Sequence, residues 1–191
     1  MSTVAAPPRV GAARALAAAL LHGLPDRLAH TAAVARRAGE LVRTVDPGDR
    51  EMLVATAWLH DIGYSPTLCE TGFHSLDGAA YLQQQGWPDR VCGLVAHHSG
   101  AVFVARARRM ADALARFRHE ESPVSDALTY ADQTVGPRGQ RMSLEERLTE
   151  VLARHGAHSA HAQVHPLRSA HIRDAAHRVE QRMSVQVIRQ R

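Results

Sequence analysis

Two adjacent polar residues, His60 and Asp61, directly follow the apolar run 53–59. Burying an imidazole or a carboxylate without a partner is costly, so apolar segments seldom end in this way. A metal ion is a suitable partner because it accepts the imidazole lone pair and neutralises the carboxylate. The sequence therefore predicts a metal site at this point. Further candidate ligands, each on or beside another apolar segment, are His30, His74, His97 and Asp132.

The elements that position these residues are predicted to be helices, because apolar residues recur at helical spacing along almost the whole chain. Asp26 is placed to cap a helix that begins near Pro25, and residues 143–146 have a capping-box pattern. The Arg-rich stretch 101–119 is predicted to form one long helix. No strand alternation is visible, so we predict an all-α fold. The expected helices span roughly 10–21, 25–45, 49–61, 74–85, 87–98, 101–119, 123–134, 144–154 and 166–183.

The composition predicts a single all-helical domain over residues 1–191. The chain is 45% hydrophobic and only 4% aromatic, which favours a core of Ala, Leu and Val on closely packed helices. Cys69 and Cys92 form no CxxC pair, so they indicate reduced thiols and a cytoplasmic location rather than a disulfide framework. The stretch 10–21 is interrupted by Arg14, and we expect an amphipathic helix there rather than a signal peptide. No apolar run reaches the roughly 18 residues of a membrane span.

All 23 basic residues are arginines, and the formal net charge is +4. A modest positive balance can attract phosphorylated ligands. Nucleic acid is not favoured as a partner, because the charge is modest and no aromatic platform for base stacking is visible. Ala-rich helix faces are compatible with a homodimer.

An ordered set of residues resembles the HD superfamily of metal-dependent phosphohydrolases. The set consists of His30, the sequence His-Asp-Ile-Gly at 60–63 and the sequence Thr-Tyr-Ala-Asp at 129–132. The resemblance covers about residues 25–155 and implies an HD-type helical bundle, followed by a C-terminal helical extension over about 156–191. It also implies one metal ion, held by His30, His60, Asp61 and Asp132.

Two further segments, 73–79 and 95–100, are similar to the extra histidines of the dinuclear branches of this superfamily. Those branches include cyclic-dinucleotide phosphodiesterases and dinucleoside-tetraphosphate hydrolases. The resemblance implies a second metal ion held by His74 and His97, with Asp61 bridging the two ions.

The substrate contacts are less closely defined. Alignment of the Gly100 spacing with those relatives favours His97 as the metal ligand, and the adjacent His98 would then contact substrate or a carboxylate outside the ligand set. Many relatives have a lysine where this chain has Tyr64, which can hydrogen-bond a phosphate but cannot neutralise it. Arginine binds phosphate bidentately, although a solvated face is the default for the Arg-rich stretch. The six histidines between 155 and 177 lack a regular ligand spacing and are expected on loops and the surface. The candidate substrate contacts are His98, Tyr64, Arg108 and Arg37.

The predicted function is hydrolysis of a phosphate ester or anhydride of a nucleotide or small phosphorylated metabolite. Two divalent transition metal ions (Fe, Mn, Zn, Co or Ni), bridged by Asp61 as the catalytic residue, would activate the attacking water. The alternative is an HD-type di-iron oxygenase, which uses a similar ligand set on an organophosphonate or polyol. A third hypothesis, a nucleotide-binding module without catalysis, is disfavoured by the full ligand set. The chain lacks the Gly-Tyr-Pro motif of the cyclic-dinucleotide branch, and its short 61–74 segment departs from the tetraphosphate hydrolases, which leaves the substrate open.

Overall fold

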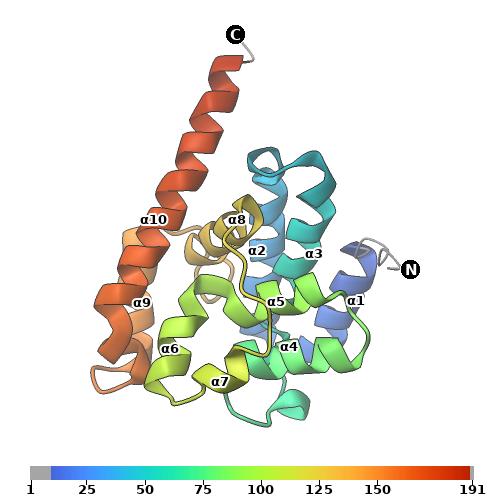
Figure 1. The fold of residues 1–191 in the computed structure, drawn as a ribbon, viewed down its shortest axis with the longest axis vertical. Coiled ribbons are helices and arrows are strands. Elements are labelled where there is room, and N and C mark those ends of the chain that lie inside the picture. Colours follow the sequence, from blue (N-terminus) through green and yellow to red (C-terminus); the bar gives the residue numbers. More distant parts are fainter. Residues whose placement is uncertain (1–9, 190–191) are drawn as a thin grey trace.

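A computed structural model describes residues 10–189, which form a bundle of helices (Figure 1). Short 3-10 turns link several helices, and within residues 10–189 the only β-type pairing is an isolated bridge between Val135 and Arg141. The all-α prediction is confirmed. The helices are α1 (Val10–Leu21), α2 (Pro25–Glu40), α3 (Arg50–Leu59), α4 (His74–Gln84), α5 (Asp89–His97), α6 (Ala101–Ala107), α7 (Ala111–Leu114), α8 (Pro123–Gln133), α9 (Leu144–His155) and α10 (Ala160–Arg189).

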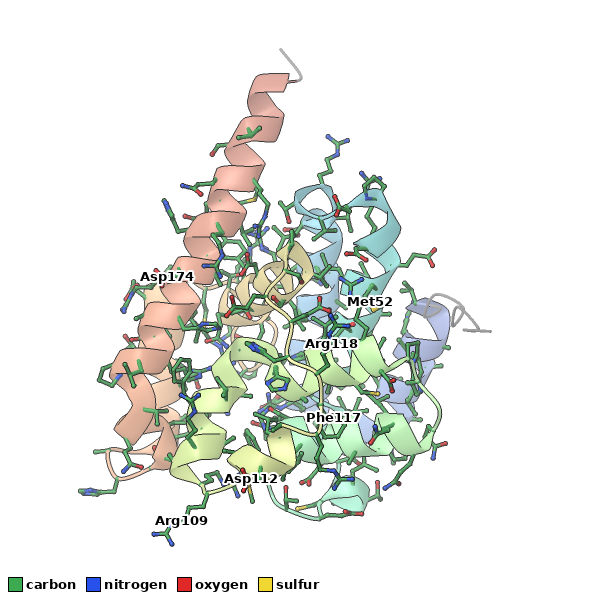
Figure 2. All side chains as sticks on the ribbon, in the orientation of Figure 1. Met52, Arg109, Asp112, Phe117, Arg118 and Asp174 are labelled. Atoms are coloured by element: carbon green, nitrogen blue, oxygen red, sulfur yellow. The ribbon has the colours of Figure 1, made fainter. Side chains whose placement is uncertain are left out.

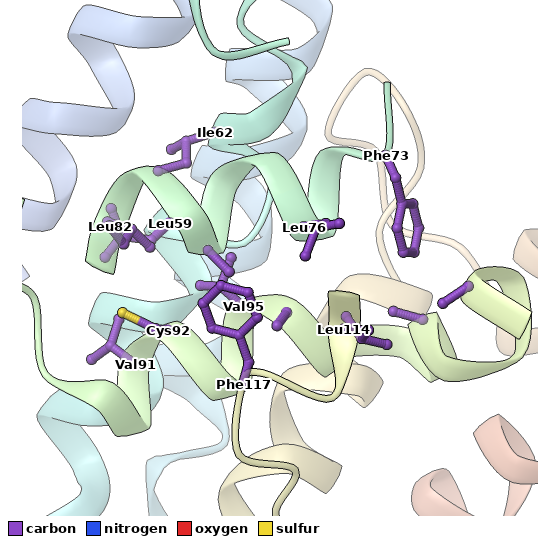
Figure 3. Packing of buried hydrophobic residues seen from close by; sticks show 14 of the residues in the cluster. Leu59, Ile62, Phe73, Leu76, Leu82, Val91, Cys92, Val95, Leu114 and Phe117 are labelled. Carbon is purple, nitrogen blue, oxygen red and sulfur yellow. The ribbon is translucent and has the colours of Figure 1, made fainter. Parts of the chain in front are cut away.

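Two apolar clusters hold the bundle together, and α3 contributes to both. One cluster joins α1, α3, α4 and α5, and Figure 3 shows Leu59 and Phe117 within it. The other joins α2, α3, α8 and α10 through residues such as Leu41 and Val179. Burying each of these side chains contributes about 1.5–3 kcal/mol. The end of α3 is therefore fixed from two sides, which positions the residues that follow it.

Two capping boxes fix the starts of helices on the later half of the chain. The Ser143 side chain accepts a hydrogen bond from the Glu146 backbone N–H at the start of α9, which confirms the predicted box. Ser122 caps α8 in the same way with Ser125. The predicted role of Asp26 is wrong. Helix α2 has no side-chain cap, because the residue before its first turn is Leu24, which has no side-chain acceptor, and Asp26 lies within the first turn.

The prediction of one long helix over 101–119 is wrong, because the chain leaves the helix at Arg109. This residue has a left-handed φ of 59°, and Figure 2 shows its side chain projecting from the surface. The Met110 N–H donates to the Ala105 carbonyl and the Arg109 N–H donates to the Arg106 carbonyl, which is the Schellman pattern that ends helices. Met110 then packs against the first apolar cluster. This contact favours the turn although glycine is absent.

Helix α10 is longer than the predicted 166–183 and contains Pro166 within it. The Ser159 side chain accepts from the Ala162 N–H, so the helix begins before the proline rather than at it. It lies against α8 and α9, and its C-terminal end projects beyond the other helices (Figure 1). No helix between residues 10 and 189, α10 included, is long and apolar enough to cross a membrane.

Candidate metal centre

Four of the predicted ligands come from three helices and meet inside the bundle. His30 lies within α2 and Asp132 near the end of α8, while His60 and Asp61 follow the last residue of α3. Both histidines are completely buried, and Asp61 and Asp132 are 3% and 5% exposed. Such buried polar groups need partners that neutralise or bind them.

The first group of ligand atoms is provided by His30, His60 and Asp132. The Nε2 atom of His30 lies 3.1 Å from Asp132 Oδ1, and His60 Nε2 lies 3.9 Å from the same oxygen. One such atom from each residue lies within 4.8 Å of the other two. This spacing suits one ion with ligand bonds of about 2.0–2.2 Å.

The second group is provided by Asp61, His74 and His98. The Nε2 atoms of His74 and His98 lie 3.4 and 3.9 Å from Asp61 Oδ1. The two nitrogens are only 3.3 Å from each other. Two imidazole lone pairs at this distance repel each other unless a proton or a cation lies between them.

Asp61 faces both groups, one with each carboxylate oxygen. While Oδ1 faces the second group, Oδ2 lies 3.4 Å from His60 Nε2 and 3.6 Å from His30 Nε2. The Arg27 guanidinium donates to the same Oδ2 at 2.6 Å, which fixes the orientation of the carboxylate. A carboxylate in this position can bridge two ions.

Backbone carbonyls select which imidazole nitrogen is available to a metal. The Nδ1 atoms of His30, His60 and His98 lie 2.9, 2.8 and 2.6 Å from the carbonyls of Gly136, Ala57 and Val95. A ring that donates Nδ1–H to a carbonyl presents its Nε2 lone pair on the other side, as metal-bound histidines do. The Nε2 of His60 is buried with no hydrogen-bond partner. This orphaned atom and the donor set around it fit a transition metal ion.

The charges in the centre keep the carboxylates ionised and two of the imidazoles neutral, whereas Asp61 and Asp132 raise the pKa of the buried His60 against the effect of its burial. Burial opposes ionisation of Asp61, but His60 and Arg27 hold the pKa of its carboxyl well below the ordinary value. Burial also lowers the pKa of His74 and that of His98, which keeps both imidazoles neutral at neutral pH. Ionised carboxylates and neutral imidazoles are the forms that coordinate metal.

Gly63 allows α4 to approach the end of α3 closely enough to bring His74 to Asp61. A Cβ atom at this position would lie 2.0 Å from the His74 carbonyl oxygen and 2.6 Å from the Gly78 nitrogen. Both neighbours are backbone atoms, so a side chain would have to displace the start of α4. The glycine after the His-Asp pair thus has a structural role in the second group.

The expectation that His97 rather than His98 belongs to the second group is corrected by the structure. His97 is the last residue of α5, and its Nε2 lies 2.9 Å from the Phe117 carbonyl, on the side away from the ligands. Helix α5 ends there, and Ser99 adopts a left-handed φ of 51°. The turn directs His98 inward, where its ring lies 5.2 Å from that of His60.

Of the predicted substrate contacts besides His98, only Tyr64 lines the cavity beside the ligand groups. The Tyr64 ring stacks on the His74 ring with centroids 4.1 Å apart. The Arg27 guanidinium lies over the same Tyr64 ring, 4.0 Å from its centroid. Arg108 instead donates to the Gly72 carbonyl. Arg37 pairs with Glu40 at 2.6 Å. Neither arginine lines this cavity, so their predicted role is not supported by their position.

The arginines that do line the cavity were missed from sequence. Arg27 lies one helical turn before His30, so helical spacing could have identified it. The others line the cavity from α9 and α10. We call these three residues the basic wall: Arg147, Arg154 and Arg168. His155 and His161 lie beside the wall with their rings stacked at 3.9 Å, which corrects the expectation of surface positions for these two histidines.

A family model of the HD domain matches residues 27–152, which is more than half of the chain. The chain belongs to the HD domain family. Proteins of this family are typically metal-dependent hydrolases, and they bind divalent metals. Neither the curated proteins nor the solved structures gave a match. The HD-domain protein thus combines the family's helical domain with two groups of residues that could hold metal ions.

Proposed function

We propose that this HD-domain protein is a dinuclear metal-dependent phosphohydrolase. The observation that carries the proposal is the position of Asp61, whose two carboxylate oxygens face two separate groups of ligands. Each group contains two imidazoles, which suit Fe, Mn, Zn, Co or Ni. The substrate would be a phosphate ester or anhydride.

The residues that would hold the ions follow from the two groups. When bound there, two divalent ions would lower the pKa of a coordinated water and neutralise phosphoryl oxygens. The rest of the chain holds the ligands in place. Ser99 and the Gln133 amide donate to Asp132 Oδ2, which leaves its Oδ1 for the first ion. The ligands would be His30, His60, Asp61 and Asp132 for one ion, and Asp61, His74 and His98 for the other.

Guanidinium groups beside the ligand groups can stabilise the charge that develops on a phosphoryl group. Arg27 is held between Asp61 and Tyr64, and Arg147 is 3% exposed with an Nε that has no hydrogen-bond partner. Preorganised donors of this kind act strongly in a site that excludes water. The cavity itself is narrow, about 50 Å³. A cavity of this size can enclose the phosphoryl group, and the rest of the substrate, a nucleotide or a small metabolite, would extend from it toward solvent.

The first experiment is metal analysis by plasma mass spectrometry, followed by anaerobic assay of phosphate release from a panel of phosphate esters. We expect about two transition metal ions per chain and phosphate release that depends on them. Iron-dependent oxygen consumption with a phosphonate or polyol, and no anaerobic phosphate release, would replace the hydrolase with the di-iron oxygenase. A cytoplasmic location and a homodimer stay predictions.

A further inference from the structure

The basic wall gives the cavity more positive than negative charge before any metal ion is considered. Glu150 lies behind the wall, where it pairs with Arg147 and Arg154. Divalent ions would increase the positive excess. A phosphate monoester brings about two negative charges, which leaves part of this excess without a counter-ion. Four guanidinium groups and two carboxylates line the cavity, those of Arg27, Arg147, Arg154 and Arg168 and those of Asp61 and Asp132.

Arg168 is the least compensated of these cations. It is 7% exposed, and none of the ion pairs among the described side chains includes it. Burial lowers the pKa of Arg168 to about 10; the charge of Asp132 opposes this shift, and that of Arg147 adds to it. A buried charge without a partner is strongly unfavourable. An anionic ligand would supply the missing partner.

The position of Arg168 is fixed by the turn that carries the metal ligands. Its Nε donates to the Ser99 carbonyl at 2.9 Å, while the Ser99 hydroxyl donates to Asp132. Its aliphatic stem lies over Gly100, where a Cβ atom would come within 3.2 Å of the Arg168 Cγ. Because Nε is already used, the two terminal nitrogens remain for a ligand in the cavity. Arg168 is therefore held beside the ligand groups but is not one of them.

Arg154 extends the same basic wall toward solvent. Its side chain is 32% exposed, whereas Asp61 and Asp132 in the same cavity are almost completely buried. The positive charge of Arg154 contributes to the lowered pKa of Arg168, as expected for neighbouring guanidinium groups. The lining of the cavity thus combines the carboxylates of the metal centre with a cationic site formed by Arg168 and the more exposed Arg154.

We infer that the substrate carries a second anionic group, a phosphate or a carboxylate, which binds Arg168 and Arg154 while the phosphoryl group to be cleaved lies at the metal-ligand groups. The inference rests on the proposed function and names the substrate class of the same site. Guanidinium groups bind both oxyanions bidentately. The HD match ends at residue 152, so both arginines lie in the part of the chain that follows it.

Three substrates that differ at one end test this inference: propyl phosphate, 2-carboxyethyl phosphate and the bisphosphate of propane-1,3-diol. The first has an uncharged end, and the other two carry a carboxylate and a phosphate there. In the metal-loaded wild-type protein, we expect kcat/KM for at least one doubly anionic compound to exceed that for propyl phosphate by about tenfold, the effect of one charge-assisted hydrogen-bonding contact. The preferred compound identifies the second group.

The variant Arg168→Gln should reduce this preference by about tenfold, and Arg168→Lys should retain part of it because the charge remains. Arg173→Gln is the matched control, since Arg173 lies on the same helix but pairs with Glu145 at the surface. If Arg168→Gln does not fold, as judged by circular dichroism, the more exposed Arg154→Gln replaces it. The control should leave the preference unchanged.

Equal kcat/KM for the three compounds in the wild-type protein would overturn the inference, as would an equal loss for all three in the Arg168 and Arg154 variants. Release of phosphate from none of them would count against the proposed function instead. Calorimetric binding of the same compounds to the metal-loaded protein would then decide the inference separately. Tighter binding of the doubly anionic compounds, lost in Arg168→Gln, supports it, and equal binding overturns it.

Discussion

The two sides of the central cavity are held in different ways. On the ligand side, backbone carbonyls fix three imidazoles through their Nδ1 atoms, and Arg27 fixes the Asp61 carboxylate, which faces both groups of ligands. On the basic wall, Arg168 forms no ion pair within the described part of the chain, and the Nε of Arg147 has no hydrogen-bond partner. His161 beside the wall likewise has an Nδ1 without a partner.

This difference indicates a division of roles. The ligand side is preorganised, so substitutions there should remove metal and with it the activity. The wall contains charge and imidazole nitrogen that the protein itself does not satisfy, so substitutions there should change ligand preference and the response to acid. Each of the following variants tests one side against the other.

The largest effect is expected for Asp61→Ala, because this carboxylate faces both groups of ligands. We expect loss of metal from both sites and a fall in activity well beyond the roughly 100-fold that loss of an outer-shell partner costs. Metal content and phosphate release measure the two effects. Asp46→Ala, at an exposed position, is the control. A fully metallated and active Asp61→Ala protein would exclude the bridging role.

Gly63→Ala should come next, because the new methyl group would meet backbone atoms of α4. We expect a loss of about 1–3 kcal/mol in the free energy of unfolding, typical of overpacking, and a weaker second metal site. Urea unfolding and metal titration measure the changes. Gly39→Ala is the control, since its Cβ has no heavy atom within 4 Å and alanine favours the helix. Equal stability of both variants would show that α4 can move without cost.

His74→Ala should remove one ion and leave the other, because His74 belongs to the second group alone. We expect about one metal ion per chain by plasma mass spectrometry and an unchanged circular dichroism spectrum. His97→Ala is the matched control and should retain both ions, since His97 bonds to the Phe117 carbonyl instead. Loss of an ion from His97→Ala but not from His98→Ala would show that His97, rather than His98, is the ligand.

The smallest effect is expected on the wall side, for His161→Gln. Burial and the neighbouring His155 lower the pKa of His161 from 6.5 to about 3. Between pH 6.5 and pH 3, the unfolded chain therefore binds a proton at this histidine that the folded chain does not. The contribution of His161 to the free energy of unfolding is fully present above pH 6.5 and is lost as the pH falls toward 3.

Between pH 7 and pH 5, the Tm of the variant should fall by about 2 °C less than the Tm of the wild type. Differential scanning calorimetry at the two pH values measures this difference. The exposed His158→Gln is the control and should behave as the wild type. An equal acid response of all three proteins would mean that the His161 imidazole is solvated.

The sequence by itself determined the helical class and most of the helices, because apolar periodicity and capping residues act over a few positions. The start of α9 at its capping box is an example, as is the end of α3 at Leu59, two residues before the predicted end at Asp61. It also indicated which polar residues are out of place on apolar segments, and the structure brings five of the six predicted ligands together. These signals are local and can be followed along the chain.

Only the tertiary structure decided which of His97 and His98 faces the centre and which arginines line the cavity. The first choice depends on where α5 ends, because His98 leaves the helix with an extended backbone (ψ 149°) and is the histidine that reaches the ligand group. The second depends on α10 packing against α8 and α9, which brings Arg168 to the Ser99 carbonyl from 69 residues away. Local periodicity carries no information about such long-range packing, whereas the chemistry of the basic wall depends on it.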